Sequence, residues 1–386
     1  MPDDHHKPCE NPLWPCAMTG AVACLAGFED IAVVIHGSSG CYFYPASLIE
    51  APIHGTFLVE NEVIFGTESR LAEVIEDLEG QYSRIAVVNT CVPAVMGEDI
   101  SGLARDGRVF IVDSPGFLGN LETGYHRALT EIAPEVDPDA AGVNIDGICL
   151  TDPFHRGNTL EARRLLNLAG VAVATTFCLD RYAATRRAAP LTVGTNPDLA
   201  SSVGRWCGSL LGLDAVIKTF EALTVAVDTI DARPVMEEVA WADARIRKAC
   251  DKYLRRFDPP RVAIFSGRSY AEFAAEMLKK YLDADITHVA ARCDADTPAV
   301  DFSVVYDMIR DAEPDLILGS SYEQMLAGDA AFVGLTPPIR DRVLLHSRAV
   351  VGIEGALWLM DDVLNACTNR GRRVRDESIP RPLTRR

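Results

Sequence analysis

The sequence predicts an α/β protein made of three Rossmann-like parallel-sheet domains. Short runs rich in β-branched residues recur along the chain, and each is followed by a Gly, Ser or Cys turn and then by a stretch of helical periodicity. Nearly continuous apolar strands that alternate with helices are typical of parallel sheets with both faces covered. The length of 386 residues agrees with two or three domains. Ligands of such folds bind beyond the carboxyl ends of the strands.

The predicted strands occupy residues 31–35, 84–88, 108–112, 144–150, 261–265 and 315–318. An apolar helix over residues 21–28 leads into the first strand, and a long helix over residues 235–257 ends before Pro259 and Pro260. A proline-rich linker is expected over residues 134–139. We therefore expect a first α/β domain over residues 1–139, a second over 143–234, a third with its joining helix over 235–369, and a loose tail over 370–386.

The charge balance excludes several classes of partner. Acidic residues outnumber basic ones, which gives a formal net charge of −18 at pH 7 and an isoelectric point near 4.9. Such a surface repels nucleic-acid phosphates and anionic membranes, so we expect neither as a partner. No apolar stretch approaches the ~18 residues that a membrane span requires, and the first residues lack the basic-then-apolar order of a secretory signal. We expect a cytoplasmic protein.

Several common catalytic motifs are missing from the sequence. It contains neither G-x-G-x-x-G nor a Gly-Lys dipeptide, so we expect no nucleotide to be bound by this chain itself. The G-x-S-x-G and H-E-x-x-H motifs are also absent, which disfavours hydrolases and zinc proteases. The 11 cysteines include no C-x-x-C pair, which disfavours zinc ribbons and thioredoxin-like sites.

Three cysteines form the candidate metal site. Cys41 and Cys91 each follow the carboxyl end of a predicted strand, and Cys16 precedes the apolar helix that leads into the first strand. Gly37 and Gly40 allow the backbone to approach a bulky inorganic ligand closely. Soft thiolates grouped at one sheet edge suit an iron-sulfur cluster. The alternative is that these cysteines are small buried hydrophobes, and the residues alone leave the two interpretations about equal.

The other cysteines receive different interpretations. Cys9 lies in a proline-rich stretch and is either an extra ligand or a residue of the cavity wall. The remaining seven are interpreted as packing residues because most fall inside apolar patterns: Cys24, Cys149, Cys178, Cys207, Cys250, Cys293 and Cys367.

Four segments of the first ~130 residues share their order and spacing with one protein family. They are CAMTGA at residues 16–21, HGSSGC at 36–41, TC and MGEDI within 90–100, and SPGFLG with GY within 114–125. In these segments the chain resembles component 1 of nitrogenase and its relatives. Those relatives include dark-operative protochlorophyllide reductase and the nickel-sirohydrochlorin a,c-diamide reductive cyclase of methanogens. Beyond these segments the likeness is one of pattern only.

The resemblance implies the fold, cofactor and partners. It implies three Rossmann-like domains of the nitrogenase component 1 type, with Cys16, Cys41 and Cys91 as ligands of an iron-sulfur cluster. It also implies a homologous or identical partner subunit, in a homodimer or heterotetramer, and an ATP-hydrolysing iron protein that delivers electrons. Three ligands per chain leave a [4Fe-4S] cluster one ligand short, so the cluster takes its fourth ligand from the partner or is larger and shared at the subunit interface.

The sequence also departs from nitrogenase proper. The turn at residues 191–197 carries no cysteine where nitrogenase has a ligand of its molybdenum-iron cofactor, and Cys178 lies in an earlier turn. His346 resembles the family's histidine ligand, although it stands closer to the following glycines, and its other interpretation is a strand-end histidine. We therefore expect a nitrogenase-like reductase of another substrate, such as a tetrapyrrole, in place of dinitrogen reduction.

Further polar residues are candidates with open roles. His36 precedes the glycine turn. It either hydrogen-bonds a cluster sulfur or passes a proton, or it only caps the strand end. Glu98 and Asp99 are expected to begin a helix after Cys91. His54, His126 and His155 either line a substrate cavity or lie at the surface.

Two other classes of function remain open at this stage. One is a scaffold that assembles a nitrogenase-type metal cofactor for another enzyme, because scaffolds of the family share the motifs of the first domain. The other is a metal-free α/β binding module in which the cysteines only pack.

Overall fold

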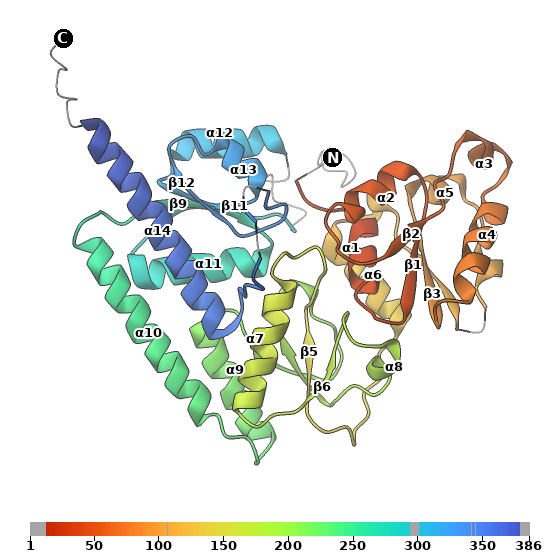
Figure 1. Cartoon of the computed structure of the whole chain (residues 1–386), viewed down its shortest axis with the longest axis horizontal. Coiled ribbons are helices and arrows are strands. Elements are labelled where there is room, and N and C mark those ends of the chain that lie inside the picture. The colour runs from red at the N-terminus through yellow and green to blue at the C-terminus, as the bar shows by residue number, and fades with distance from the viewer. Residues whose placement is uncertain (1–12, 106, 294–300, 341, 344, 379–386) are drawn as a thin grey trace, which may run out of the picture.

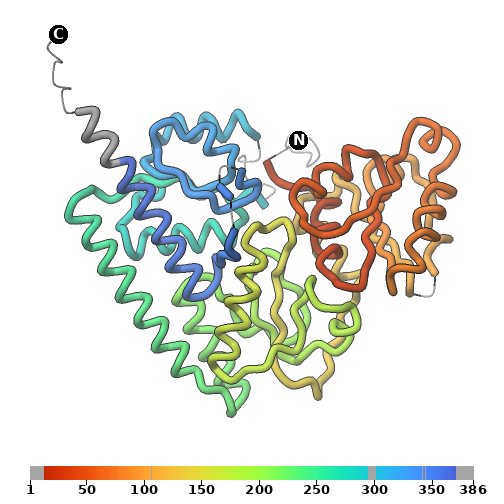
Figure 2. The backbone as a smooth tube through the Cα atoms, in the orientation of Figure 1, coloured from red at the N-terminus to blue at the C-terminus, as the bar shows by residue number. Residues whose placement is uncertain are grey.

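The protein folds into three lobes, each built on one parallel four-stranded sheet with helices on its faces (Figure 1). The computed structural model describes residues 13–105, 107–293, 301–340, 342–343 and 345–378, with side chains through residue 370. The predicted fold class is therefore confirmed. The tube in Figure 2 shows that the chain completes the first lobe before it enters the second, and the second before the third. The residue boundaries of the three domains stay a prediction.

The first lobe contains the candidate cysteines. Its strands are β1 (Ile31–His36), β2 (Ile53–Gly55), β3 (Arg84–Asn89) and β4 (Val109–Asp113). Its helices are α1 (Ala17–Leu25), α2 (Ser39–Ala46), α3 (Glu60–Phe65), α4 (Glu68–Glu79), α5 (Cys91–Met96) and α6 (Leu121–Ile132), with short 3-10 turns η2 (Ser101–Leu103) and η3 (Gly116–Leu118).

The second lobe follows the same plan. Its strands are β5 (Val143–Asp146), β6 (Val173–Thr176), β7 (Leu191–Gly194) and β8 (Arg205–Ser209). Its helices are α7 (His155–Leu168), α8 (Tyr182–Thr185) and α9 (Leu213–Ala226), with the 3-10 turn η4 (Pro197–Leu199). The long helix α10 (Arg233–Leu254) then leads to the third lobe.

The third lobe completes the described chain. Its strands are β9 (Arg261–Ser266), β10 (Asp285–Ala291), β11 (Leu316–Gly319) and β12 (Ala331–Gly334). Its helices are α11 (Arg268–Leu282), α12 (Phe302–Ala312), α13 (Ser321–Leu326) and α14 (Gly352–Ser378).

All three sheets have the same strand order. The orders are β2-β1-β3-β4, β6-β5-β7-β8 and β10-β9-β11-β12, and every pairing is parallel. In each sheet the chain winds outward in opposite directions from the two central strands. The point between these strands is the topological switch point, where the loops diverge and leave a crevice. The three switch points lie between β1 and β3, between β5 and β7, and between β9 and β11.

The second and third lobes share one hydrophobic core, whereas the first lobe has cores of its own. A continuous set of buried side chains runs from Val143 in β5 through α10 to Val363 in α14. In the first lobe, α1 and α6 cover one face of the sheet and α4 covers the other. The core between the first sheet and helices α1 and α6 also contacts Cys149, Phe177 and Cys178 of the second lobe.

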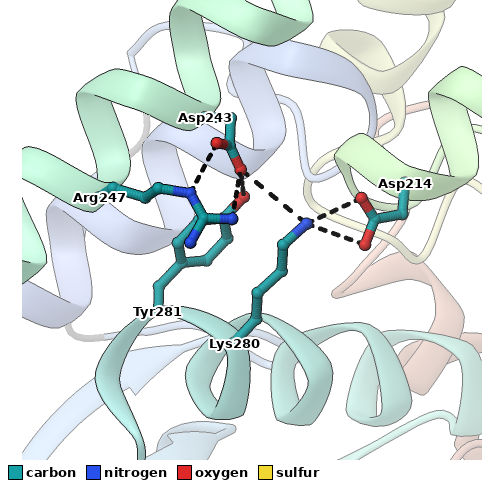
Figure 3. A network of polar contacts seen from close by, with 5 residues as sticks. All are labelled: Asp214, Asp243, Arg247, Lys280 and Tyr281. Carbon is teal, nitrogen blue, oxygen red and sulfur yellow. Dashed lines mark hydrogen bonds and ion pairs between the residues drawn. The ribbon is translucent and has the colours of Figure 1, made fainter.

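A polar network also joins the helices of the second and third lobes (Figure 3). Lys280 of α11 lies 2.8 Å from Asp214 of α9 and 3.9 Å from Asp243 of α10. Asp243 also accepts hydrogen bonds from the Tyr281 hydroxyl at 2.6 Å and from Arg247 Nε at 2.7 Å. The three successive helices α9, α10 and α11 are thus held by one set of side chains.

Helix α14 is anchored on the second lobe at its start. The buried Glu161 of α7 accepts hydrogen bonds from the amide groups of Ile353 and Glu354 at 3.0 and 3.2 Å. A carboxylate at a helix N-terminus satisfies amide groups that have no partner within the helix. The last helix of the third lobe is therefore fixed to the second lobe.

Some predicted elements differ in extent from those observed. The predicted strand 144–150 ends at Asp146, because Gly147 adopts a φ of +82° and turns the chain. The predicted helix 21–28 begins earlier, at Ala17, and ends at Leu25. Helix α14 continues past Arg370 to Ser378, into the segment expected to be a loose tail. Among the described residues, no helix combines the length and apolar character that a membrane crossing needs.

Candidate functional site

Each of the three candidate cysteines lies at the N-terminus of a helix. Cys16 is the N-cap of α1, Cys41 lies in the first turn of α2, and Cys91 is the first residue of α5. All three side chains are half-buried. The amide groups at a helix N-terminus favour a negatively charged ligand nearby.

Strand pairing accounts for the nearness of Cys41 and Cys91. The central strands β1 and β3 are in register to their ends, where His36 pairs with Asn89. The turns that follow carry the two cysteines, so both lie at the switch point of the first sheet. A Cβ atom on Gly37 would lie 2.0 Å from Thr90 Oγ1, so only glycine allows these turns to approach so closely. The corresponding position at Gly40 meets only Ser38 Oγ, at 3.9 Å, so no close approach explains that glycine.

Close packing of α1 against α6 places Cys16. A Cβ atom on Gly20 would lie 1.8 Å from the Leu121 carbonyl oxygen, and one on Gly124 would lie 1.6 Å from the Ala17 carbonyl oxygen. The two helix backbones therefore touch directly. The amide of Ala17 also donates a hydrogen bond to the Gly119 carbonyl at 2.9 Å, which fixes the start of α1 beside η3.

The three sulfur atoms share one polar environment. The Gly116 amide donates a hydrogen bond to Cys91 Sγ at 3.1 Å, and Ser38 Oγ lies 3.9 Å from Cys41 Sγ. Burial raises the pKa of the Cys41 thiol, the Ser38 hydroxyl lowers it, and the neighbouring Cys91 and Cys16 thiolates raise it again. Cys41 is therefore within electrostatic reach of both other cysteines. A cation between the sulfurs would remove their mutual repulsion.

His36 is buried beside this group and is held by two threonines. Its Nε2 lies 2.9 Å from Thr67 Oγ1, and its Nδ1 lies 3.2 Å from Thr56 Oγ1. The Thr67 hydroxyl donates to the Glu98 carboxylate, so its oxygen accepts a hydrogen bond from the Nε2–H group of His36. Burial lowers the pKa of His36 to about 4, although the Glu98 charge acts in the opposite direction. His36 is therefore a neutral imidazole that joins β1 to the segments following β2 and preceding α4.

The expectation that Glu98 and Asp99 begin a helix is wrong. The Glu98 carboxylate accepts the Thr67 amide at 2.7 Å and the Glu68 amide at 3.2 Å, which caps α4 from 30 residues away in the chain. Asp99 accepts the Ser101 amide at 2.9 Å and so caps η2. The left-handed Gly97 ends α5 immediately before them, with a φ of +68°, and this stop is what redirects the two acids.

Exposed apolar side chains lie on the helices that carry Cys41 and Cys91 and on elements packed against them. Phe43 of α2 is 75% exposed, Val95 of α5 is 77% exposed and Phe117 of η3 is 46% exposed. The neighbouring helix α3 has no buried residue and exposes Ile64 and Phe65. We call these five residues the apolar rim. Apolar side chains gathered at this density mark a surface that binds another protein.

The other candidates from the sequence lie elsewhere. His346 is exposed in the segment between β12 and α14, and no contact joins it to the cysteines. Cys178 is fully buried between Cys24 Sγ, at 3.3 Å, and the Tyr125 hydroxyl, at 3.0 Å. Cys9 lies outside the described residues. Of the seven cysteines expected to pack, six are buried; Cys293 is the exception because it is half-exposed.

A second polar region lies where the three lobes meet, and the sequence did not predict it. A small cavity there is lined by Glu122 of α6, by Asp198 of η4, and by the buried pair of Asp152 and Tyr270. None of His54, His126 and His155 lines it. Asp198 and Asp152 follow strand ends, and this position could have marked them in the sequence as candidate site residues. Only the packing of the lobes brings them together with Glu122.

Comparisons with known proteins agree with this fold. The family model described as nitrogenase component 1 type oxidoreductase matches residues 16–368. The nitrogenase molybdenum-iron protein beta chain of Methanococcus maripaludis is 24% identical over 442 aligned positions, which cover 93% of this chain and 94% of that protein. The nitrogenase iron-molybdenum cofactor biosynthesis protein NifE of Bradyrhizobium diazoefficiens is 23% identical and covers 92% of this chain and 74% of that protein.

A solved structure supports the same assignment at the level of the fold. The structure titled "Nitrogenase Cp1 at pH 6.5" matches with a TM-score of 0.76 and 17% identity, over 94% of each chain. Because the family match extends over nearly the whole length, the chain belongs to the nitrogenase component 1 type oxidoreductases.

Proposed function

We propose that this chain is the catalytic component of a nitrogenase-like reductase. In this proposal Cys16, Cys41 and Cys91 hold an iron-sulfur cluster that receives electrons from an ATP-hydrolysing iron protein and passes them to a bound substrate. The observation that carries the proposal is that three half-buried cysteines lie at the starts of three different helices. Cys41 and Cys91 lie at the switch point of the first sheet, and both Cys16 and Cys91 are within electrostatic reach of Cys41.

The chemistry of the donor set fits such a cluster. Three sulfurs are soft ligands, and soft ligands favour iron-sulfur clusters over hard ions such as Mg²⁺. Hydrogen bonds from backbone amides to the sulfurs are one of the means by which proteins set cluster potential, and Gly116 supplies one to Cys91. Cys41 feels the charge of both other thiolates, which bound iron would neutralise.

The residues around Cys16, Cys41 and Cys91 position these cysteines and control the access of protons to them. A bound cluster would supply one-electron transfer. The protein holds the turn at Gly37 against Thr90 and keeps His36 neutral at neutral pH. The partly buried position of the cysteines lowers the local dielectric, which strengthens the interaction between cluster charge and backbone amides.

The apolar rim supports a partner subunit at the same edge. Three thiolates leave a [4Fe-4S] cluster one ligand short, so the missing ligand comes from the partner, or six thiolates from two chains share a larger cluster. The partner is a homologous or an identical subunit. Replacement of the 84%-exposed Phe65 by Asp is expected to break the assembly and leave the fold intact, which sedimentation velocity and circular dichroism would measure. Leu160→Asp, at a 61%-exposed position of α7, is the control.

The substrate in this proposal is an unsaturated organic molecule, with a tetrapyrrole as the first choice. The turn at residues 191–197 lacks the cysteine that a molybdenum-iron cofactor would need, and Cys178 is closed off by Cys24 and Tyr125. Neither observation favours dinitrogen as the substrate.

The decisive experiment is anaerobic purification followed by a count of iron and acid-labile sulfide per chain. We expect both in the wild type, and loss of both in Cys16→Ala, Cys41→Ala and Cys91→Ala. Cys250→Ala, which changes a buried cysteine of α10, is the control and should keep full iron. A wild-type protein without iron would favour the metal-free binding module, and a variant that keeps its iron would remove that cysteine from the ligand set.

A second candidate function is the assembly of a metal cofactor for another enzyme. The match to the cofactor biosynthesis protein NifE over 92% of this chain favours it. Repeated turnover of a substrate by the purified protein with its iron protein would support the reductase. Transfer of a metal cluster to an acceptor protein, without turnover, would support the scaffold.

A further inference from the structure

Three potential metal ligands from three different lobes meet beside the cavity between the lobes, and two of them, Glu122 and Asp198, line its wall. They are Glu122 at the start of α6, Asp198 in η4 and Cys293 just after β10. One ligand atom of each lies within 4.8 Å of the corresponding atoms of the other two, and all three residues are half-buried. This site is separate from the cysteines of the first sheet.

The distances suit a single small cation. A tetrahedral zinc ion with bonds of about 2.3 Å to sulfur and about 2.1 Å to oxygen separates its ligand atoms by about 3.6 Å. Because the three atoms lie within 4.8 Å of one another, they need to move closer by no more than about 1 Å, which a rotation of the side chains achieves.

Neighbouring donors already orient all three ligands. Trp14 Nε1 donates to Glu122 at 3.1 Å. The Ser269 hydroxyl and amide donate to the Asp198 carboxylate at 2.6 and 3.0 Å. The Arg268 amide donates to Cys293 Sγ at 3.3 Å. Hydrogen bonds of this kind fix ligand orientation in metal sites and increase metal affinity.

An independent feature of the same cavity points to a ligand. The Ser266 side chain is fully buried at the end of β9 and lines the cavity with Glu122 and Asp198. Its hydroxyl has no hydrogen-bond partner among the described residues. Buried polar groups are nearly always satisfied, so this hydroxyl requires a partner inside the cavity. The cavity has a volume of about 40 Å³, which holds about three water molecules. This is enough space for a water molecule at the open coordination position of a bound metal ion.

We propose that Glu122, Asp198 and Cys293 bind one divalent transition-metal ion with the preferences of zinc. One thiolate and two carboxylates form a mixed soft and hard set, which suits zinc more than magnesium or calcium. Three protein ligands leave the fourth position to a water molecule, which the Ser266 hydroxyl orients. The site ties the three lobes together and does not depend on the proposed reductase function.

Cobalt titration tests this site in the full chain. The protein is purified anaerobically with its native iron, and Co²⁺ is added while thiolate-to-cobalt charge transfer is followed by difference spectroscopy. We expect one equivalent to bind with this band, to be displaced by Zn²⁺, and to raise the melting temperature because three lobes are joined.

Variants show whether the charge-transfer band comes from a metal ion bound at Glu122, Asp198 and Cys293. Cys293→Ser is expected to lose the charge-transfer band and Glu122→Gln to weaken binding strongly. Ser269→Ala is expected to weaken binding about tenfold, because Asp198 loses the hydroxyl donor and keeps only the amide donor of residue 269. Cys207→Ser, at a cysteine outside the cavity, is the control and should bind like the wild type. Cys91→Ala should keep the band, which separates this site from the proposed iron-sulfur cluster.

Three results would overturn the proposal: no cobalt equivalent in the wild type, a band that survives Cys293→Ser, or a band lost in Cys91→Ala. A thermal melt of each variant without metal identifies any that fails to fold. The conservative Cys293→Ser and Glu122→Gln changes then allow the conclusion to be drawn from whichever variant folds.

Discussion

The switch point of the first sheet differs from those of the other two, although all three sheets have the same strand order. In the first lobe, the turns after the central strands carry half-buried cysteines and open onto the apolar rim. In the second and third lobes, the turns after β5 and β9 face each other across a small cavity and are closed by buried polar side chains. One topology thus provides an open edge in one place and an internal junction in another.

The difference suggests a division of labour between the two regions. Changes at the open edge should alter metal content and assembly with little effect on folding, because the side chains there are partly solvated. Changes at the internal junction should alter the free energy of unfolding first, because buried polar groups lose their partners there. The predictions below test this division from the largest expected effect to the smallest.

The largest expected effect comes from the buried ion pair of the third lobe. Arg292 and Glu323 are both fully buried and paired, and Arg292 also donates to the Leu13 carbonyl at 3.0 Å. Glu323→Ala leaves the guanidinium without its counter-charge, which should lower the free energy of unfolding by about 3–5 kcal/mol. Urea unfolding of the apo protein measures this. Glu79→Ala, in a looser pair at 3.9 Å, is the control, and equal losses in both variants would contradict the prediction.

His36 lies buried beneath the open edge and makes a pH-dependent contribution to stability, unlike the partly solvated side chains of that edge. The folded pKa of His36 is lowered to about 4 from its ordinary 6.5, so the unfolded chain binds a proton more readily. Stability from this residue is complete above pH 6.5 and is lost as the pH falls from 6.5 to 4, by about 3 kcal/mol in total.

The comparison of wild type with His36→Gln isolates this contribution from other titrating groups. The difference between their unfolding free energies should change over that pH range and stay constant above it. A difference that is independent of pH would show that His36 is not held neutral in the fold.

A smaller effect is expected from a hydrogen bond at the internal junction. The Tyr270 hydroxyl donates to the buried Asp152 carboxylate at 2.6 Å, while Asn158 donates to the same oxygen at 3.1 Å. Tyr270→Phe removes one of these donors and should lower the free energy of unfolding by about 1–3 kcal/mol. Iron content should not change. Tyr306→Phe on an exposed face of α12 is the control, and a loss of iron in Tyr270→Phe would break the division between the regions.

The smallest effect is expected from the exposed network of Figure 3. Lys280 is about one-third exposed and pairs with Asp214 and Asp243, so solvent screens much of the attraction. Lys280→Ala should cost about 0.5 kcal/mol, with less effect at high salt. Lys218→Ala is the control. A loss above about 2 kcal/mol would mean that this network, and not the shared core, holds the two lobes together.

Local pattern was enough to predict the fold class and the nearness of two cysteines. Strands in one parallel sheet end at the same edge, so any residue that follows β1 or β3 must lie near the other. The position of Cys16 could not be derived this way, because it depends on the contact between α1 and α6 at Gly20 and Gly124. The family resemblance supplied what local pattern could not.

Other features depend on contacts between segments that are distant in sequence. Glu98 caps α4 instead of starting its own helix, and nothing near residue 98 shows that its partner amides lie at residues 67 and 68. Cys293 resembled a packing cysteine because it follows an apolar strand, yet the orientation of the third lobe places it beside Glu122 and Asp198. A pattern within one segment cannot report how lobes are oriented.

The path of the chain between lobes also determines how the molecule can move. The second and third lobes are joined twice, by the length of α10 and by the start of α14 on Glu161. The first lobe is joined to the second by one connection, residues 133–142. A hinge motion that opens the second and third lobes must break both attachments and a shared core. A rotation of the first lobe leaves those attachments intact and must break its contacts with Cys149, Phe177 and Cys178 of the second lobe. Breathing motions that admit solvent or ligand to the interior should therefore pivot about that single connection.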